Sequence, residues 1–381
     1  MARVGFMIDT LAPGAGTENQ LILLLSRLEA HGHACHLAFL ETHPRFPEAG
    51  VTVPVYEAGV GKLASFRGAA GMVGTARWMR RSRLDVLVTF FRDAGLFGTV
   101  AARLAGLPVV AARRNLGYWQ SPREIRLLRT LRPWIHAYVA NSEAARDHTA
   151  EIEGVDPVRI AVIPNAVDGS RFHPATAAER RALRNAYGFP LEAPLVLCVA
   201  NLRPVKGHDT LLRAFTRVPK DAHLLLAGDG PEEGALRADC AKLGLDGRVH
   251  FLGRVPDPAP FMRLADMGVL ASRSESLPNA LVEMASVGLP LVATRAGGNE
   301  EVLAGGQAGV LVEVDDAVLL GDRIAAFLAN ETERRDLADK ARRHAASVYD
   351  QDRVVRMWAE ALTVWSRRGV PDAGAGIRSE V

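Results

Sequence analysis

Two acidic residues of this sequence, Glu275 and Glu283, lie eight positions apart. Their types and spacing suggest a site that binds hydroxyl groups. They lie within 271–302, where an apolar run gives way to a polar elbow and then to a helical pattern over Asn279 to Val287. A carboxylate accepts hydrogen bonds from two hydroxyls. Two carboxylates that face one space therefore favour a polyol over a second phosphate.

The start of that helix predicts an anion site beside the two carboxylates. Asn279 is suited to be the N-cap residue, and the unpaired backbone amides expected at Asn279 to Leu281 attract negative charge. A second buried strand, Leu289 to Thr294, ends at the pair Gly297-Gly298. Ligands of open α/β sheets bind beyond the carboxyl ends of the strands, so the stretch predicts a site for a phosphorylated sugar.

Two cations follow another predicted strand, Leu195 to Ala200. Arg203 and Lys206, in the segment NLRPVKG, would neutralise a leaving diphosphate without a metal ion. A solvated turn is the alternative. The turn Gly228-Asp229-Gly230-Pro231 also follows a strand, and its sequence fits either a ligand contact or a tight turn.

The N-terminal half predicts a strand, a glycine-rich turn and a helix. The strand Arg3 to Leu11 runs into Pro13-Gly14-Ala15-Gly16-Thr17 and a helix over Glu18 to Ala30. Gly14 and Gly16 would let the backbone approach a ligand closely, although turn geometry alone explains them too. The full G-x-G-x-x-G pattern is absent, so the turn is weak evidence for a dinucleotide.

Strand and helix patterns alternate along both halves, which is typical of doubly wound parallel sheets. Further strands are expected at His33 to Leu40, Val51 to Tyr56, Leu84 to Phe91, Val109 to Ala112, Ala137 to Ala140, Ile160 to Ile163, Leu224 to Ala227, Val249 to Leu252, Val269 to Ala271 and Val310 to Val312, and helices at Leu96 to Leu104, Glu143 to Glu151, Ala177 to Tyr187 and Val354 to Trp365. A chain of 381 residues is too long for one ordinary core. We therefore expect an α/β protein with two Rossmann-like domains, 1–170 and 171–353, and a disordered tail at 371–381.

Composition narrows the function. The chain is 48% hydrophobic with a net charge of only +3, which argues against a nucleic-acid partner. Its charge is uneven, because 62–132 holds fourteen basic and three acidic residues. This stretch, and the segment 113–132 above all, is interpreted either as a solvated basic face or as a surface that meets an anionic membrane or positions a lipid-linked acceptor.

We expect a cytoplasmic protein for three reasons. The three cysteines have no metal-type spacing, no signal-peptide pattern is present, and no apolar run reaches about 18 residues. The protein would be able to associate peripherally with the inner face of the cell membrane through the basic stretch.

These motifs together resemble glycosyltransferase family 4, retaining enzymes of GT-B fold that use nucleotide sugars. The resemblance covers nearly the whole chain. It is carried by PGAGTE, by Ile163 to Asp168 with Phe172, by Leu202 to Gly207, by Gly228 to Pro231, by Phe251-Leu252-Gly253, by Glu275 with Glu283, and by Gly297-Gly298 with Glu301.

The resemblance implies roles for single residues. Lys206 would bind the donor diphosphate, Glu283 the ribose, and Gly16 would approach the sugar phosphate. Glu275 and the backbone of 276–279 would hold the transferred sugar. The implied catalytic residues are Arg203, Lys206 and Glu275, and the implied donor-binding residues are Gly14, Gly16, Asn201, Gly228, Gly230, Gly253, Arg254, Ser276, Leu277, Pro278, Asn279, Ala280, Leu281 and Glu283. The closing helix at 354–370 would pack on the N-terminal domain.

Two positions depart from the family pattern. Asn201 stands where the family often has an arginine, so Arg203 would have to supply a second cation. No histidine follows the fourth strand, which reads VTFFRDAG. The polar residues nearby, proposed for the acceptor side, are Arg92, Asp93, Arg113 and Arg114. The D-x-D motif of GT-A enzymes occurs only at 350–352, before the last helix, where it is interpreted as a helix cap; no metal or other cofactor is expected.

The resemblance implies a hexosyltransferase that moves a sugar from a UDP- or GDP-sugar to a glycan, a lipid-linked or a small-molecule acceptor, in cell-surface polysaccharide or glycolipid synthesis. Two alternatives remain at this point. One is an epimerase-like GT-B enzyme, and the other is a catalytically degenerate module that binds nucleotide sugars.

Overall fold

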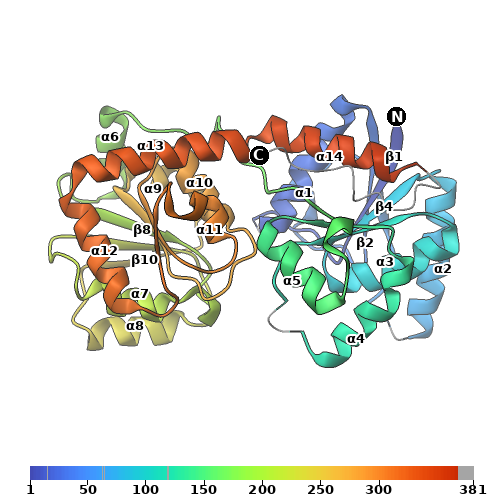
Figure 1. Ribbon diagram of the computed structural model, residues 1–381, viewed down its shortest axis with the longest axis horizontal. Helices are drawn as coiled ribbons and strands as arrows, with labels where there is room; N and C mark the ends of the chain where they lie inside the picture. The colour runs from blue at the N-terminus through green and yellow to red at the C-terminus, as the bar shows by residue number, and fades with distance from the viewer. Residues whose placement is uncertain (15, 62, 64, 118–119, 368–381) are drawn as a thin grey trace. The chain divides into compact units, whose positions relative to one another are not determined.

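The computed structural model describes residues 1–14, 16–61, 63, 65–117 and 120–367, which divide into two compact units. Unit 1 comprises Met1–Ala166 and the chain from Asp352 onward, and unit 2 comprises Val167–Gln351. Each unit contains its own parallel sheet and its own core (Figure 1). The tail expected at 371–381 lies outside the described residues.

Within the described residues, the sheet of unit 1 has seven parallel strands in the order β3-β2-β1-β4-β5-β6-β7. The strands are β1 Ala2–Ile8, β2 His33–Phe39, β3 Val55–Glu57, β4 Val86–Thr89, β5 Val109–Arg113, β6 Ala137–Ala140 and β7 Ile160–Val162. The helices are α1 Gly16–Arg27, α2 Phe66–Arg81, α3 Arg92–Ala105, α4 Pro122–Leu131, α5 Glu143–Glu153 and α14 Gln351–Trp365, with short 3-10 turns at Leu28–His31, Phe46–Ala49, Arg132–Trp134 and Pro157–Arg159. Strand order reverses between β1 and β4, which is where ligands bind in doubly wound sheets.

Alternating side chains of the strands build a core on each face of this sheet. On β1, Val4, Phe6 and Ile8 join the cluster that contains α1 and α14, whereas Met7 joins the cluster that contains α3. Both faces are therefore covered, which explains why the strands read as apolar runs in the sequence.

Helix α14 brings the C-terminal part of the chain onto the sheet of unit 1 (Figure 1). Trp358 and Trp365 are almost fully buried there, with their ring centroids 6.3 Å apart. Trp358 also stacks on Phe90, the residue that follows β4, at 6.4 Å. This helix thus supports the segment that leaves the central strand of the unit.

Unit 2 has a six-stranded parallel sheet in the order β10-β9-β8-β11-β12-β13. Its strands are β8 Leu195–Val199, β9 His223–Ala227, β10 Val249–Gly253, β11 Met267–Leu270, β12 Leu291–Thr294 and β13 Val310–Val312. Its helices are α6 Ala177–Tyr187, α7 His208–Phe215, α8 Glu233–Lys242, α9 Ala259–Leu264, α10 Asn279–Val287, α11 Asn299–Val302, α12 Ala317–Ala329 and α13 Glu331–Val348, with 3-10 turns at Pro204–Lys206 and Ala304–Gly306. Here the order reverses between β8 and β11, so the segments after these neighbouring strands begin side by side.

Several expected boundaries were wrong, each for a local physical reason. The strand expected at Val51 to Tyr56 begins only at Val55, because Pro54 has no N–H to donate to the ladder. The strand expected at Leu84 to Phe91 is limited to Val86–Thr89. Arg83 and Phe91, at its two ends, have positive φ values of 51° and 67° that break the extended chain.

Replacing Trp358 tests how strongly α14 stabilises unit 1. Trp358→Ala removes a buried ring that packs on Phe90 and Trp365, so we expect the unfolding free energy to fall by about 3–5 kcal/mol. The matched control is Glu360→Ala, which changes an exposed residue of the same helix. Urea unfolding followed by circular dichroism measures both. Equal stability of the two variants would contradict this role of the helix.

Candidate functional site

An ion pair joins the segments that follow the two central strands of unit 2. Lys206 Nζ donates to Glu275 Oε1 at 2.6 Å, and Ser272 Oγ donates to the same oxygen at 2.6 Å. The Glu275 side chain is 8% exposed and that of Lys206 is 25% exposed. The ammonium is therefore fixed by a nearly buried carboxylate but still reaches solvent.

Close backbone approaches hold these two segments together. Gly207 has φ +64°, and a Cβ at this position would collide with the carbonyl oxygen of Ala271. The Arg273 amide donates to Val205 O at 2.7 Å. Any larger residue at 207 would push the segment after β8 away from the segment after β11.

Arg273, which was not singled out from the sequence, ties the same segments through its side chain. Its guanidinium donates to Asp209 Oδ2 at 2.8 Å and to Asp315 Oδ1 at 2.9 Å, and it also donates to the Pro204 carbonyl. The hydrogen bonds to Asp209 and Asp315 raise the pKa of Arg273. The pKa of Asp209 is lowered although burial alone would raise it, because Arg273 donates to it, and the same hydrogen bonding lowers the pKa of Asp315. Arg273 thus ties the turn Pro204–Lys206 to the segment after β11.

The groups behind the ion pair are uncharged at neutral pH. Burial, together with the nearby Lys206 charge, lowers the pKa of His208 to about 4. Burial raises the pKa of the Cys198 thiol to about 12. Neither group therefore adds a charge next to the Lys206–Glu275 pair.

The turns after β9, β10 and β12 close around the same strand ends. Gly228 N donates to Gly253 O at 2.9 Å, and a Cβ at Gly230 would collide with Leu202. Gly298 N donates to Glu275 O at 3.1 Å, and a Cβ at Gly298 would collide with Ser276 O. Glycine is required at 228, 230 and 298 because backbone atoms occupy the space that a side chain would need.

Asn279 is not the N-cap of α10, which corrects the expectation from the sequence. The N-cap is Pro278, whose carbonyl accepts from Leu281 N at 3.1 Å and from Val282 N at 3.2 Å. Asn279 is the first residue of the helix instead. The Leu281 amide therefore donates to the Pro278 carbonyl and is not available to an anion. Fewer backbone amides face outward at this end of the helix than the sequence predicted.

Glu283 lies one turn into α10 and is only partly exposed. Burial raises its pKa to about 7, the charge of Arg171 lowers it and that of Asp257 raises it. Arg171 Nη2 and Asp257 Oδ1 form an ion pair of 2.8 Å. That Glu283 faces the same space as Glu275 stays a prediction.

The other residues expected at the donor site have these positions. Asn201, Arg203 and Arg254 are exposed, Ser276, Leu277 and Pro278 are buried, Ala280 is partly buried in the first turn of α10, Gly14 accepts no side chain at φ +102° without strain, and Gly16 is the first residue of α1. Arg203 N donates to Asn201 O at 2.8 Å, so the segment is compact while its cationic side chain reaches solvent.

A cavity of about 390 Å³ lies in unit 1, at the reversal point of its sheet. Its lining comes from the segments after three neighbouring strands and from α4, and consists of Asp9, Phe91, Arg92, Ala112, Arg113, Arg114, Asn115, Gln120 and Leu128. Three of the four residues proposed for the acceptor side are among them. The fourth, Asp93, pairs with Arg92 at 2.7 Å.

Two features of this cavity were not found from the sequence. Asp9 follows β1 and accepts from Ala94 N at 2.6 Å, which caps α3 from another segment. Helix α3 therefore begins at Arg92 and not at Leu96 as expected. Phe91 adopts φ 67° and ψ 177°, a conformation that only glycine adopts readily, and such strain concentrates at functional sites.

Comparisons with known proteins agree with this architecture. A family model described as Glycosyltransferase Family 4 matches residues 14–171, and one described as Glycosyl transferases group 1 matches residues 179–344. A D-inositol 3-phosphate glycosyltransferase of Thermomonospora curvata is 30% identical over 293 residues, which are 69% of this chain and 68% of that protein.

An N-acetyl-alpha-D-glucosaminyl L-malate synthase of Bacillus anthracis is 32% identical over 185 residues, 48% of either chain. The chain spans about half the length of several such curated relatives. The crystal structure of Anabaena Alr3699/HepE in complex with UDP and glucose is similar in fold, with a TM-score of 0.84 and 22% identity over 95% of this chain and 100% of that one.

The partly buried carboxyl of Asp9 makes the stability of the protein depend on pH. Burial and the charge of Asp93 raise its pKa from 3.8 to about 6, against the effects of Arg92 and the Ala94 amide. The folded state therefore binds more protons than the unfolded state between these values, and its stability falls as pH rises through this window. Glu18, whose pKa is also raised by burial and by Asp9, adds a change of the same sign.

Asp9→Asn keeps the acceptor for the Ala94 amide and removes the charge. We expect the variant to be more stable than the wild type by about 2 kcal/mol at neutral pH, and equally stable near pH 4. Urea unfolding of both proteins across this pH range measures the difference. A difference that does not change with pH would contradict the assignment.

Proposed function

The chain belongs to glycosyltransferase family 4, and on that premise we propose that it transfers a hexosyl group from a UDP- or GDP-sugar to an acceptor hydroxyl with retention of configuration. The observation that carries the proposal is the Lys206–Glu275 pair at the reversal point of the unit 2 sheet. An ammonium has three N–H donors, and Glu275 accepts one of them. The others are suited to the oxygens of a diphosphate.

In the proposed reaction, the bond from the anomeric carbon to the diphosphate oxygen breaks while the acceptor oxygen bonds to that carbon on the same face. Lys206 stabilises the negative charge that develops on the leaving diphosphate, and Arg203 adds a second cation when its exposed side chain turns to the ligand. The diphosphate takes the proton of the acceptor hydroxyl. No metal ion and no nucleophilic side chain take part.

The two glutamates hold the donor in this proposal. Glu275 Oε1 already accepts hydrogen bonds from Lys206 Nζ and Ser272 Oγ. Its other oxygen, Oε2, therefore accepts a hydroxyl of the sugar, and the backbone of 276–279 also contacts the sugar. Glu283 accepts from the ribose hydroxyls. Burial raises the pKa of Glu283 to about 7 because it destabilises the charged carboxylate. Hydrogen bonds from the ribose hydroxyls would stabilise that charged form and offset the desolvation.

Relatives support the donor and the acceptor classes. The Anabaena protein binds UDP and glucose, and the names of two relatives give malate and inositol 3-phosphate, both small hydroxylated anions. A small-molecule, glycan or lipid-linked acceptor in cell-surface polysaccharide or glycolipid synthesis fits the same chemistry. An epimerase would instead isomerise the donor without acceptor, and a degenerate module would bind it without turnover.

A panel of UDP- and GDP-sugars separates these functions. We expect acceptor-dependent release of nucleotide, unchanged by EDTA, with an α-linked product from an α-linked donor. Isomerised donor without acceptor would favour the epimerase. Binding without either product would favour the module, and a strict requirement for Mn²⁺ would contradict the metal-free mechanism.

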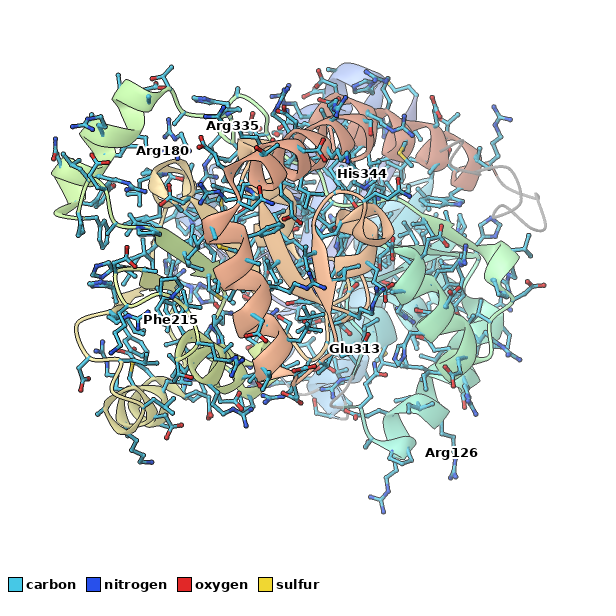
Figure 2. All side chains as sticks on the ribbon, turned by 60° about the vertical axis from the view of Figure 1, so that its left-hand side comes forward. Arg126, Arg180, Phe215, Glu313, Arg335 and His344 are labelled. Carbon is cyan, nitrogen blue, oxygen red and sulfur yellow. The ribbon has the colours of Figure 1, made fainter. Side chains whose placement is uncertain are left out.

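We also propose that α4 contacts an anionic membrane surface. Leu127 of α4 and Trp134 of the 3-10 turn after it are apolar residues that are 45% and 43% exposed, and Arg123 and Arg126 of α4 are exposed too. Figure 2 shows Arg126 extending from α4 away from the rest of its unit. Exposed aromatic and apolar side chains between arginines are typical of interfacial helices. Arg113 and Arg114 line the cavity, so the surface is limited to 123–134.

Within the described residues, none of the helices has the length and apolar character needed to cross a bilayer.

Lys206 gives the first test of the transferase site. Lys206→Ala should lower kcat/KM for the nucleotide sugar by roughly 10²–10³, because it removes a cation that acts on the leaving group. It also leaves Glu275 unpaired, so Lys206→Arg, which retains the charge, should keep more of the activity and of the melting temperature. Lys242→Ala, at an exposed ion pair on α8, is the control. Full activity of Lys206→Ala would reject the site.

Liposome sedimentation tests the membrane surface. The chain should bind anionic vesicles and not neutral ones, and salt should weaken binding. Replacing Arg123 and Arg126 by glutamine should weaken binding by about 1 kcal/mol per residue, whereas Arg103→Gln, an exposed arginine of α3, should not. Binding that ignores salt and these substitutions, or no binding at all, would reject the surface.

A further inference from the structure

The arginines around the unit 1 cavity differ in how their charges are balanced. Arg92 pairs with both Asp93 and Glu124. Arg113 forms a bidentate pair with the buried Glu153, with Nη2 to Oε2 at 2.9 Å. Both guanidiniums are therefore neutralised by carboxylates of the protein itself.

Arg114 has neutral partners instead. It donates to the amide oxygen of Asn165 and lies over the Phe90 ring, 5.9 Å from the centroid. Its Nε is buried without a hydrogen-bond partner among the described residues. Burial lowers its pKa to about 10, which expresses the cost of a cation whose desolvation no nearby carboxylate offsets. A guanidinium on a cavity wall in this state favours an anionic ligand.

The position of Arg114 is fixed by the core. Phe90, on which it lies, is fully buried and stacks on Trp358 of α14. The neighbouring residue Phe91 carries the strained backbone of the cavity wall. An unbalanced charge and a strained residue beside one cavity are two independent signs of a ligand site.

A second polar group lines the same cavity. This group is Asp9, which follows β1, whereas Arg114 follows β5. The cation that lowers the pKa of Asp9 is Arg92. The cavity therefore offers a carboxylate that accepts hydroxyls and a guanidinium that attracts an anion. Its volume of about 390 Å³ is within the range of small-ligand sites.

We propose that this cavity binds an acceptor that carries both hydroxyls and an anionic group, with the phosphate or carboxylate held by Arg114 and a hydroxyl accepted by Asp9. The inference rests on the proposed transferase function, of which it specifies the acceptor class. It adds a role for Arg114 that its neighbours Arg92 and Arg113 do not share, because their charges are already paired.

Three probes with one carbon skeleton test the proposal: glycerol 3-phosphate, glycerate and glycerol. Binding to the full chain is measured by isothermal titration calorimetry with UDP at saturation, so that a donor site is already occupied. We expect at least one of the two anions to bind and glycerol not to bind. Comparing the two anions separates a phosphate site from a carboxylate site.

Variants then locate the anion. Arg114→Gln keeps a donor for Asn165 and removes the charge, so the anion affinity should fall by about tenfold or more. Arg114→Lys should bind better than Arg114→Gln, and the exposed Arg103→Gln should match the wild type. A crystal of the wild type soaked with glycerol 3-phosphate gives the position of the anion without any variant.

The proposal is overturned if neither anion binds to the wild type, if glycerol binds as tightly, if Arg114→Gln retains the full affinity, or if the soaked anion lies away from Arg114. UDP affinity and nucleotide release, measured in parallel, report on the transferase function separately. If UDP binds but neither anion binds, this inference is rejected and the proposed function is not. If the anion binds but UDP does not, the proposed function is rejected and the anion site is retained.

Discussion

The salt bridge between Lys206 and Glu275 is the interaction on which the rest of unit 2 depends. It joins residues 69 positions apart at a distance of 2.6 Å. A nearly buried carboxylate without that ammonium would be an uncompensated charge, which costs several kcal/mol. The surrounding structure keeps the two side chains together. Backbone packs closely at Gly207 against Ala271 and at Gly298 against Ser276. The Arg273 side chain also bridges to Asp209 and Asp315. Such a preorganised cation needs little rearrangement when charge develops on a bound ligand.

Unit 1 uses the same topology with a different balance of charge. In both sheets the order of the strands reverses near the middle, and in both polar residues lie just after the strands on either side of that point. In unit 2 the two charged side chains neutralise each other, and the site is completed by loops. In unit 1 the aromatic stack from Trp358 through Phe90 supports Arg114, which forms no ion pair with a carboxylate of the described residues. Closing helix α14 is thus part of the cavity's support as well as of the fold.

Much of this architecture could be predicted from sequence because it depends on short patterns. The alternation of apolar strands and amphipathic helices predicted the two parallel sheets, and polar residues just after buried strands drew attention to Lys206 and Glu275. The same rule, applied to β1, would have found Asp9. Arg114 was singled out by comparison with the family pattern. Other features depend on strand order, which the chain does not reveal locally. Arg113 is neutralised by Glu153, 40 positions later, and α3 begins early because Asp9 caps it from 85 positions away.

The most direct measurement of the central claim is the crystal structure of the protein with an intact nucleotide sugar bound. The account predicts diphosphate oxygens within hydrogen-bond distance of Lys206 Nζ, at the carboxyl ends of β8 and β11, with Glu275 still in contact with the ammonium. A nucleotide bound elsewhere, or a diphosphate neutralised by a divalent ion while Lys206 contacts Glu275 alone, would contradict it.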